Sequence, residues 1–150
     1  TGDLMVKEGS LPLMKEIHIF IDLCATGTKQ ERNDKINRLI QGVYSIAMFM
    51  IESGIPQAYI WYDKVNGVIQ EYSVEQEEEL YWMFQELFRS KTTTEESELM
   101  EAYVDWGKGR LLESALYLTV ADHESLDSGN LVRDRLEVMD LRGDVIEDQE

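Results

Sequence analysis

The stretch Ile17-His18-Ile19-Phe20-Ile21-Asp22 is apolar almost throughout and ends in an aspartate. A short, nearly continuous apolar run predicts a strand that is buried on both faces of a parallel sheet. A second run, residues 115–121, ends in the same way at Asp122. Ligands of open α/β sheets bind beyond the carboxyl ends of the parallel strands. If these two strands are neighbours, Asp22 and Asp122 share one rim of the sheet and can hold one ion between them.

The segment after Asp22 predicts a long helix followed by a hairpin. Apolar residues recur at three- and four-residue steps from Ile36 to Ile51, and Gly54 follows as a stop signal. Residues 58–62 and 68–72 are rich in β-forming side chains. The segment between them contains Asn-Gly, which favours the positive φ angles of a tight turn, so the two runs are expected to pair.

Two further helices are expected before the second strand. Ser73-Val74-Glu75-Gln76 has the pattern of a capping box, which predicts a helix opening at this point. Its buried stripe is expected to contain Leu80, Met83, Phe84, Leu87 and Phe88. A shorter helix is expected to start at the threonine run 92–94 and to stop at Gly107. Trp82 lies off the stripe and is the candidate for an exposed contact, although packing against the shorter helix is the favoured explanation for it.

The remaining elements complete an α/β pattern. Residues 4–7 are expected to form a short edge strand, residues 130–141 a helix, and residues 144–147 a final strand. The order β-α-β-β-α-α-β-α-β, with one hairpin in an alternating chain, predicts a mostly parallel sheet with one antiparallel edge strand. We therefore expect an edge segment over residues 1–14 and a single domain over residues 15–150, a length that suits one hydrophobic core.

Composition narrows the classes of partner. The chain has 30 acidic and 14 basic residues, a net charge of −16, which disfavours binding to nucleic acid or to an anionic membrane and suits cations or a basic protein. The longest apolar stretch, residues 43–51, is too short to span a bilayer. Cys24 is the single cysteine, which excludes an internal disulfide and favours a reducing, cytoplasmic compartment. The chain begins without methionine or a signal peptide, so we expect it to be a fragment of a longer parent protein.

The strand-end residues suggest a site for a hard cation. Mg²⁺ prefers oxygen ligands and retains several waters, and Asp22, Thr26, Asp122 and the threonines 92–94 could supply such ligands. Cys24 occupies the position between Asp22 and Thr26 where a second hydroxyl is expected. A thiol is a poorer Mg²⁺ ligand than a hydroxyl, so such a site would be weakened.

This ordered set of features resembles a von Willebrand factor A-type domain. The set consists of a strand with an Asp-x-Ser-x-Ser-like loop, a long helix, a hairpin, a threonine loop and a later strand-end aspartate. The resemblance implies a three-layer, Rossmann-like α/β fold and a metal-ion-dependent adhesion site, at which a carboxylate of a protein partner completes the Mg²⁺ shell. Asp22 and Thr26 match its first loop, Thr94 or a neighbouring threonine its second, and Asp122 its third. Cys24 departs from the pattern and makes the site degenerate.

The closer resemblance is to a bacterial branch, the family called domain of unknown function 58. It rests on residues 4–8, on the strand ending at Asp22 and on the hairpin from Tyr59 to Tyr72, and it covers Leu4 to Asp122. It implies a protein-binding module without catalytic activity, a MoxR-type AAA+ ATPase as partner, and a parent protein anchored to a membrane through other segments. Thr26, Thr94 and His123 are the candidate contacts for the partner.

Three enzyme classes are alternatives. Asp22-x-Cys24-x-Thr26 is one residue away from the start of haloacid-dehalogenase-type phosphatases, in which the first aspartate is the nucleophile and a second aspartate is the general acid. Another metal-dependent hydrolase, such as a PIN-type nuclease, would need more carboxylates around two metals, and the net charge disfavours its substrate. Cys24 could act as a nucleophile only beside a histidine, for which His123 is the candidate; a loop-packing role for His123 is favoured.

Overall fold

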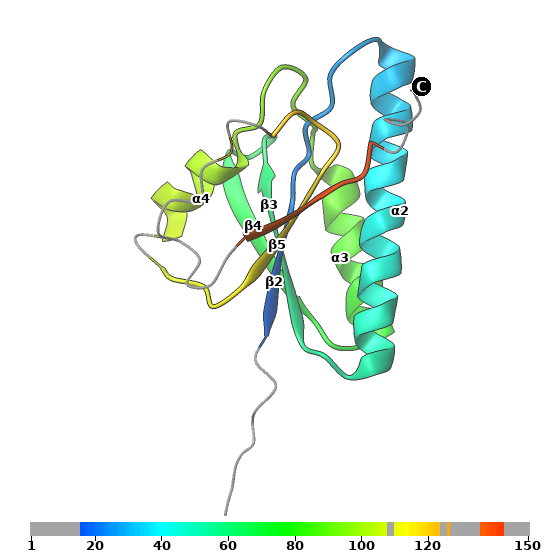
Figure 1. The fold of residues 1–150 in the computed structure, drawn as a ribbon, viewed down its shortest axis with the longest axis vertical. Helices are drawn as coiled ribbons and strands as arrows, with labels where there is room; N and C mark the ends of the chain where they lie inside the picture. Colours follow the sequence, from blue (N-terminus) through cyan, green and yellow to red (C-terminus); the bar gives the residue numbers. More distant parts are fainter. Residues whose placement is uncertain (1–15, 108–109, 124–125, 127–135, 143–150) are drawn as a thin grey trace, which may run out of the picture.

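The computed structural model describes residues 16–107, 110–123, 126 and 136–142. This part of the chain forms five strands and three helices (Figure 1). The strands are β2 (Ile17–Ile21), β3 (Gln57–Asp63), β4 (Val68–Val74), β5 (Ala115–Thr119) and β6 (Leu136–Asp140). The helices are α2 (Lys29–Ser53), α3 (Glu77–Arg89) and α4 (Leu99–Gly107).

The strands form one sheet in the order β4-β3-β2-β5-β6. The central strand β2 is parallel to both neighbours, so that Ile19 lies between Tyr59 of β3 and Leu116 of β5. Strand β6 continues the parallel sheet beside β5, and β4 pairs antiparallel with β3 as the hairpin. The prediction of an α/β fold with a mostly parallel sheet and one antiparallel pair is therefore confirmed.

The two faces of the sheet pack against different helices. Ile19 and Ile21 of β2 belong to the core cluster that contains the buried side chains of α2 and α3. Phe20, between them, points the other way and packs with Tyr103 of α4, with ring centroids 5.0 Å apart. Successive side chains of a strand alternate between faces, so a strand covered on both sides must be apolar at every position. This requirement explains the continuous apolar run.

Helix α2 has strong local signals at both ends. The Thr28 hydroxyl accepts a hydrogen bond from the Glu31 amide, and the Glu31 carboxylate accepts one from the Thr28 amide, which together make a capping box. At the other end Gly54 adopts φ 71°, and its amide donates to the Ile51 carbonyl. This left-handed conformation favours glycine and ends the helix where the sequence predicts.

The prediction of a helix over residues 130–141 is wrong for its second half. Residues Leu136–Asp140 form strand β6, in register with Ala115–Thr119 of β5. Leu136 and Val138 pack in the core cluster on the α4 side of the sheet, whereas Met139 is exposed, so the apolar period is two rather than that of a helix. The strands expected at 4–7 and 144–147 lie outside the described residues.

The starts of the two shorter helices also differ from the prediction. Ser73 belongs to β4, where it pairs with Ala58, and Gln76 is the N-cap of α3. The Glu79 carboxylate accepts hydrogen bonds from the amides of Glu75 and Gln76, so the box begins three residues later than the sequence suggested. Helix α4 begins at Leu99 rather than at the threonine run.

Two side chains of α3 are also more exposed than expected. Phe88 was expected in the core but is 65% exposed, and it lines an open groove between α2 and α3. Trp82 is 54% exposed and is not packed in the core.

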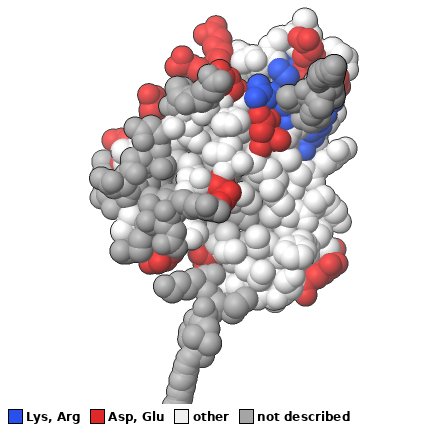
Figure 2. Space-filling model, viewed as in Figure 1, with Lys and Arg blue, Asp and Glu red and all other residues white. Residues whose placement is uncertain are grey.

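The surface carries the excess of acidic residues unevenly. On the face seen in Figure 2, acidic side chains are spread over the molecule, whereas Lys and Arg gather near the upper end of α2. Within the described residues, no helix combines the length and the hydrophobicity that a membrane span requires.

Replacing Gly54 by alanine should lower the free energy of unfolding by about 1 kcal/mol, because an L-residue is strained at this φ. Urea denaturation measures the loss. The neighbouring Ser53→Ala is the control and should stay within about 0.5 kcal/mol of wild type. An equal loss in both variants would contradict this account of the helix end.

Candidate functional site

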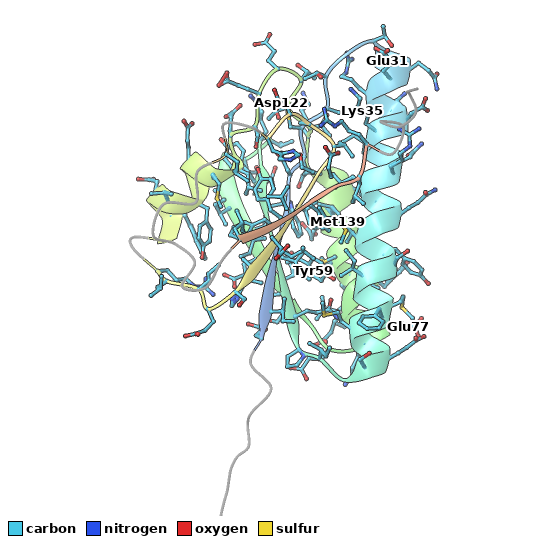
Figure 3. The ribbon with its side chains drawn as sticks, in the orientation of Figure 1. Glu31, Lys35, Tyr59, Glu77, Asp122 and Met139 are labelled. Carbon is cyan, nitrogen blue, oxygen red and sulfur yellow. The ribbon has the colours of Figure 1, made fainter. Side chains whose placement is uncertain are left out.

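A pocket of about 430 Å³ opens at the carboxyl ends of β2 and β5. The segments that follow both strands contribute to it, as does the loop before α4. Asp122 lies at this end of the sheet (Figure 3). The lining residues are Asp22, Cys24, Thr26, Glu95, Glu96, Ser97, Met100, Glu101, Tyr117, Ala121, Asp122, His123 and Leu126.

The sheet itself brings the two aspartates together. Strands β2 and β5 are parallel neighbours, and their pairing continues one step further through the bond from the Asp22 amide to the Leu118 carbonyl, 3.0 Å. The chain leaves both strands at the same rim, so Asp22 and Asp122 line one pocket. Asp22 is buried at its base, whereas Asp122 is exposed.

The Asp22 carboxylate is held by two hydroxyl groups. One oxygen accepts a hydrogen bond from Ser97 Oγ at 2.7 Å, and the other accepts one from Thr119 Oγ1 at 3.0 Å. Only 3% of Asp22 is exposed. Burial raises the pKa of this carboxyl above its ordinary value, and the hydrogen bonds from Ser97 and Thr119 oppose that rise. Asp22 thus joins three segments of the chain at the base of the pocket.

The loop after Asp22 is fixed by backbone bonds to the loop before α4. Cys24 forms an isolated parallel bridge with Thr93, through bonds from the Thr93 amide to the Leu23 carbonyl, 2.7 Å, and from the Ala25 amide to the Thr93 carbonyl, 3.0 Å. Cys24 is 1% exposed, and burial raises the pKa of its thiol. A buried thiol with a raised pKa is a poor nucleophile at neutral pH.

The threonines of the candidate site have different roles. Thr26 lines the pocket, and its carbonyl accepts a hydrogen bond from Lys35 Nζ of α2 at 3.0 Å. Thr94 is exposed and does not line the pocket, so the structure does not bring it to Asp22. The hydroxyl of the adjacent Thr93 is turned to the Leu23 carbonyl.

Ser97 supplies the hydroxyl that the sequence assigned to Thr94. It donates to Asp22, lies 3.3 Å from the Tyr117 hydroxyl, and accepts a hydrogen bond from the amide of Leu99 at the start of α4. A serine two residues before an apolar helical run is a recognisable start signal, so the pattern around Ser97 could have indicated its position. Its contact with Asp22 depends on the tertiary fold, and no local sequence pattern predicts it.

His123 lines the same pocket from the loop after β5. Its Nδ1 lies 3.3 Å from the Ala121 carbonyl and 3.8 Å from a carboxylate oxygen of Asp140 in β6. His123 therefore contacts both its own loop and strand β6 while it lines the pocket, and the surface or loop-packing role favoured from the sequence stays a prediction. The other histidine, His18, lies away from the pocket and contacts Arg110 at 3.1 Å.

The pocket is strongly acidic and fits Mg²⁺ poorly. Its lining includes Asp22, Glu95, Glu96, Glu101 and Asp122, and no Lys or Arg from the part of the chain that the structure describes. Across the described residues, no three His, Cys, Asp or Glu side chains are grouped so as to hold a metal. Both oxygens of Asp22 already accept hydrogen bonds, and Cys24 offers a soft sulfur in place of a hard oxygen. In this arrangement, neither Asp22 nor Cys24 offers the free hard oxygen that a tightly bound Mg²⁺ ion requires.

Comparison of the chain with models of known protein families, with curated proteins and with solved structures gave no match.

Replacing Ser97 by alanine should lower the free energy of unfolding by about 1–3 kcal/mol, since the buried carboxylate of Asp22 loses one of its two hydroxyl donors. The matched control is Thr94→Ala in the same loop, which should change stability by less than about 0.5 kcal/mol. Urea denaturation at neutral pH compares them. Stability lost equally in both variants would argue against the structural difference between these two hydroxyls.

Asp22→Asn should change the pH dependence of stability in a definite direction. The raised pKa of Asp22 means that the folded chain binds this proton more tightly than the unfolded chain, whose value is near 3.8. Wild type therefore loses stability as pH rises through the interval between the two pKa values. Asparagine does not titrate, so the stability of the variant relative to wild type should increase between about pH 4 and pH 7. Urea denaturation across this range measures it, and a difference that is constant or falls with pH would contradict the assigned shift.

Proposed function

We propose that this chain is a von Willebrand A-type domain with a three-layer, Rossmann-like architecture, and that it acts as a non-catalytic protein-interaction module. The observation that carries the proposal is the pocket at the carboxyl ends of β2 and β5, where Asp22, Thr26 and Asp122 lie together. The strand order β4-β3-β2-β5-β6, with its single antiparallel pair, is compatible with this assignment.

The chemistry of the pocket supports a basic contact group on the partner. Glu95, Glu96, Glu101 and Asp122 contribute carboxylates to the lining, and among the described residues no lysine or arginine lines the pocket. A lysine or arginine of the partner would be attracted to this opening and would find several acceptors there. Thr26 and His123 can add hydrogen bonds, and the exposed Thr94 lies next to Glu95, just outside the pocket.

Binding of the partner would not depend on Mg²⁺. The hydroxyl bonds to Asp22 and the buried thiol of Cys24 leave at most a weak Mg²⁺ site at this position. An intact adhesion site works differently, because there a carboxylate of the partner binds the Mg²⁺ ion. Here the partner supplies the positive charge itself.

A MoxR-type AAA+ ATPase is the proposed partner class, and a membrane-anchored parent protein the proposed context; both come from the family resemblance. The phosphatase alternative receives less support from the geometry. Its nucleophile would be Asp22, whose carboxylate is buried, bonded to two hydroxyls and raised in pKa.

Charge reversal at the pocket should weaken the complex with a MoxR-type AAA+ ATPase from the same organism. Glu96→Lys and Asp122→Lys are each expected to reduce affinity about tenfold, because each replaces an attraction by a repulsion. Biolayer interferometry measures binding with Mg²⁺ and with EDTA, and wild type should bind equally in both.

The control for these variants is Glu75→Lys, an exposed glutamate just before α3, outside the pocket, which should bind as wild type does. Loss of binding in EDTA would instead favour an intact metal site. Turnover of a phosphate ester with Mg²⁺, abolished by Asp22→Ala, would establish the phosphatase alternative.

A further inference from the structure

A second and larger cavity lies away from the acidic pocket, in the groove between α2 and α3. Its volume is about 810 Å³. Ile40 and Tyr44 line it from α2, and Tyr81, Phe84 and Phe88 line it from α3. The remaining lining residues are glutamine and serine, so the walls carry no charge.

The aromatic side chains of this groove are exposed to an unusual degree for a helix surface. Tyr44 is 51% exposed, Tyr81 63% and Phe88 65%. Phe84 connects them, with ring centroids 6.4 Å from Tyr44 and 5.6 Å from Phe88. Single exposed apolar residues are ordinary, but a contiguous aromatic group of this kind marks a contact surface.

One end of the groove is acidic. Glu52 follows Ser45 by two helical turns on α2, and Glu77 precedes Tyr81 by one turn on α3. The two helices run in opposite directions, and Glu77 lies beside the C-terminal end of α2 (Figure 3). Glu52, Glu77 and Glu78 are all exposed there. The surface over the middle turns of α2 is uncharged, and acidic atoms lie at its lower end (Figure 2).

The walls favour a helix as the occupant. Both walls are helices, whose backbone donors and acceptors are bonded internally, so they offer no backbone partner to an extended peptide. Such a peptide would leave its own amide groups unpaired in an apolar groove, whereas a helix satisfies them itself. A third helix can also pack its side-chain ridges between those of α2 and α3.

The charges favour a basic partner over a second copy of the chain. Two copies, each with a net charge of −16, repel one another at a distance. The same repulsion opposes docking on an anionic membrane. A helix with lysine or arginine at one end would instead be attracted to the glutamates at the lower end of the groove.

We propose that the groove between α2 and α3 docks an amphipathic helix of a partner protein. The helix presents apolar side chains at helical spacing to Tyr44, Tyr81, Phe84 and Phe88, and it places a basic end against Glu52, Glu77 and Glu78. This surface is separate from the acidic pocket, so it stands whether or not the pocket binds a partner.

The test uses a fluorescent 14-residue amphipathic peptide with leucine and phenylalanine at positions i, i+3, i+4 and i+7 and three lysines in its last turn. Fluorescence anisotropy measures its affinity for the chain. A peptide of the same composition with the apolar residues scattered around the helix is the first control. The second has glutamates in place of the three lysines. Wild type should bind the lysine-ended amphipathic peptide most tightly.

Variants of the chain connect binding to the groove. Tyr44→Ser and Phe88→Ser should each weaken binding about tenfold. Trp82→Ser is the matched control, because Trp82 is an exposed aromatic of α3 that does not line the groove, and it should bind as wild type does. Glu52→Lys combined with Glu77→Lys should reverse the preference between the lysine-ended and glutamate-ended peptides. Melting curves establish that each variant is folded.

Several results would overturn the proposal. These are equal losses in Phe88→Ser and Trp82→Ser, no preference for the amphipathic over the scattered peptide, or a charge preference that survives the double variant. Sedimentation velocity that shows a dimer dissociated by Tyr44→Ser would assign the groove to a second copy. Retention on phosphatidylcholine–phosphatidylserine vesicles that requires Phe88 would assign it to a membrane.

Discussion

The buried carboxylate of Asp22 is the interaction on which the arrangement at the rim of the sheet depends. An acidic group with 3% exposure is costly unless its oxygens are bonded. Here its partners come from the start of α4 and from the end of β5, so that satisfying one carboxylate fixes three distant segments relative to one another. The parallel bridge at Cys24 and Thr93 adds backbone bonds between two of them. The base of the pocket is therefore held by bonds between these segments, whereas Asp122 at its rim is exposed.

The acidic pocket and the aromatic groove between α2 and α3 differ in the forces that they offer to a partner. The pocket presents carboxylates around a polar cavity, where attraction is long-range and is screened by salt. The groove presents aromatic rings, where binding depends on the burial of apolar area and on close packing. A module with both surfaces can combine fast electrostatic encounter at one with slow dissociation at the other.

The sequence predicted the elements whose hydrophobic period is unambiguous. The continuous apolar run of β2, the long stripe of α2 and the Asn-Gly hairpin all appear where expected. The sequence predicts a helix where strand β6 forms, because only Leu136 and Val138 show the two-residue spacing of a strand. Five residues are too few to distinguish that spacing from the spacing of a helix. The N-cap of α3 was placed too early because Ser73 has the right composition but is engaged in the sheet.

Only the part of the candidate site that follows from the order of strands in the sheet could be predicted from the sequence. Asp22 and Asp122 follow paired strands, so their meeting at one pocket follows from topology. The choice of Ser97 over Thr94 depends on a bridge between two loops, which no local pattern encodes. Phe88 was assigned to the core because its spacing continues the stripe of α3. Helix α3 therefore has two adjoining apolar faces: one packs in the core, and the other, which includes the exposed Phe88, faces the groove beside α2. The spacing of apolar residues alone does not separate the two faces, because Phe84 lies between them and contacts Tyr44 of α2.

Helix α2 is common to both surfaces. Near its beginning, Lys35 donates a hydrogen bond to the Thr26 carbonyl at the pocket, and its middle turns form one wall of the groove. A displacement of this helix along its axis would stretch the Lys35 bond and shift the Tyr44 ring in a single movement. Any ligand that prefers one axial position of α2 would then alter affinity at the distant surface, and linkage requires the effect to be the same in both directions.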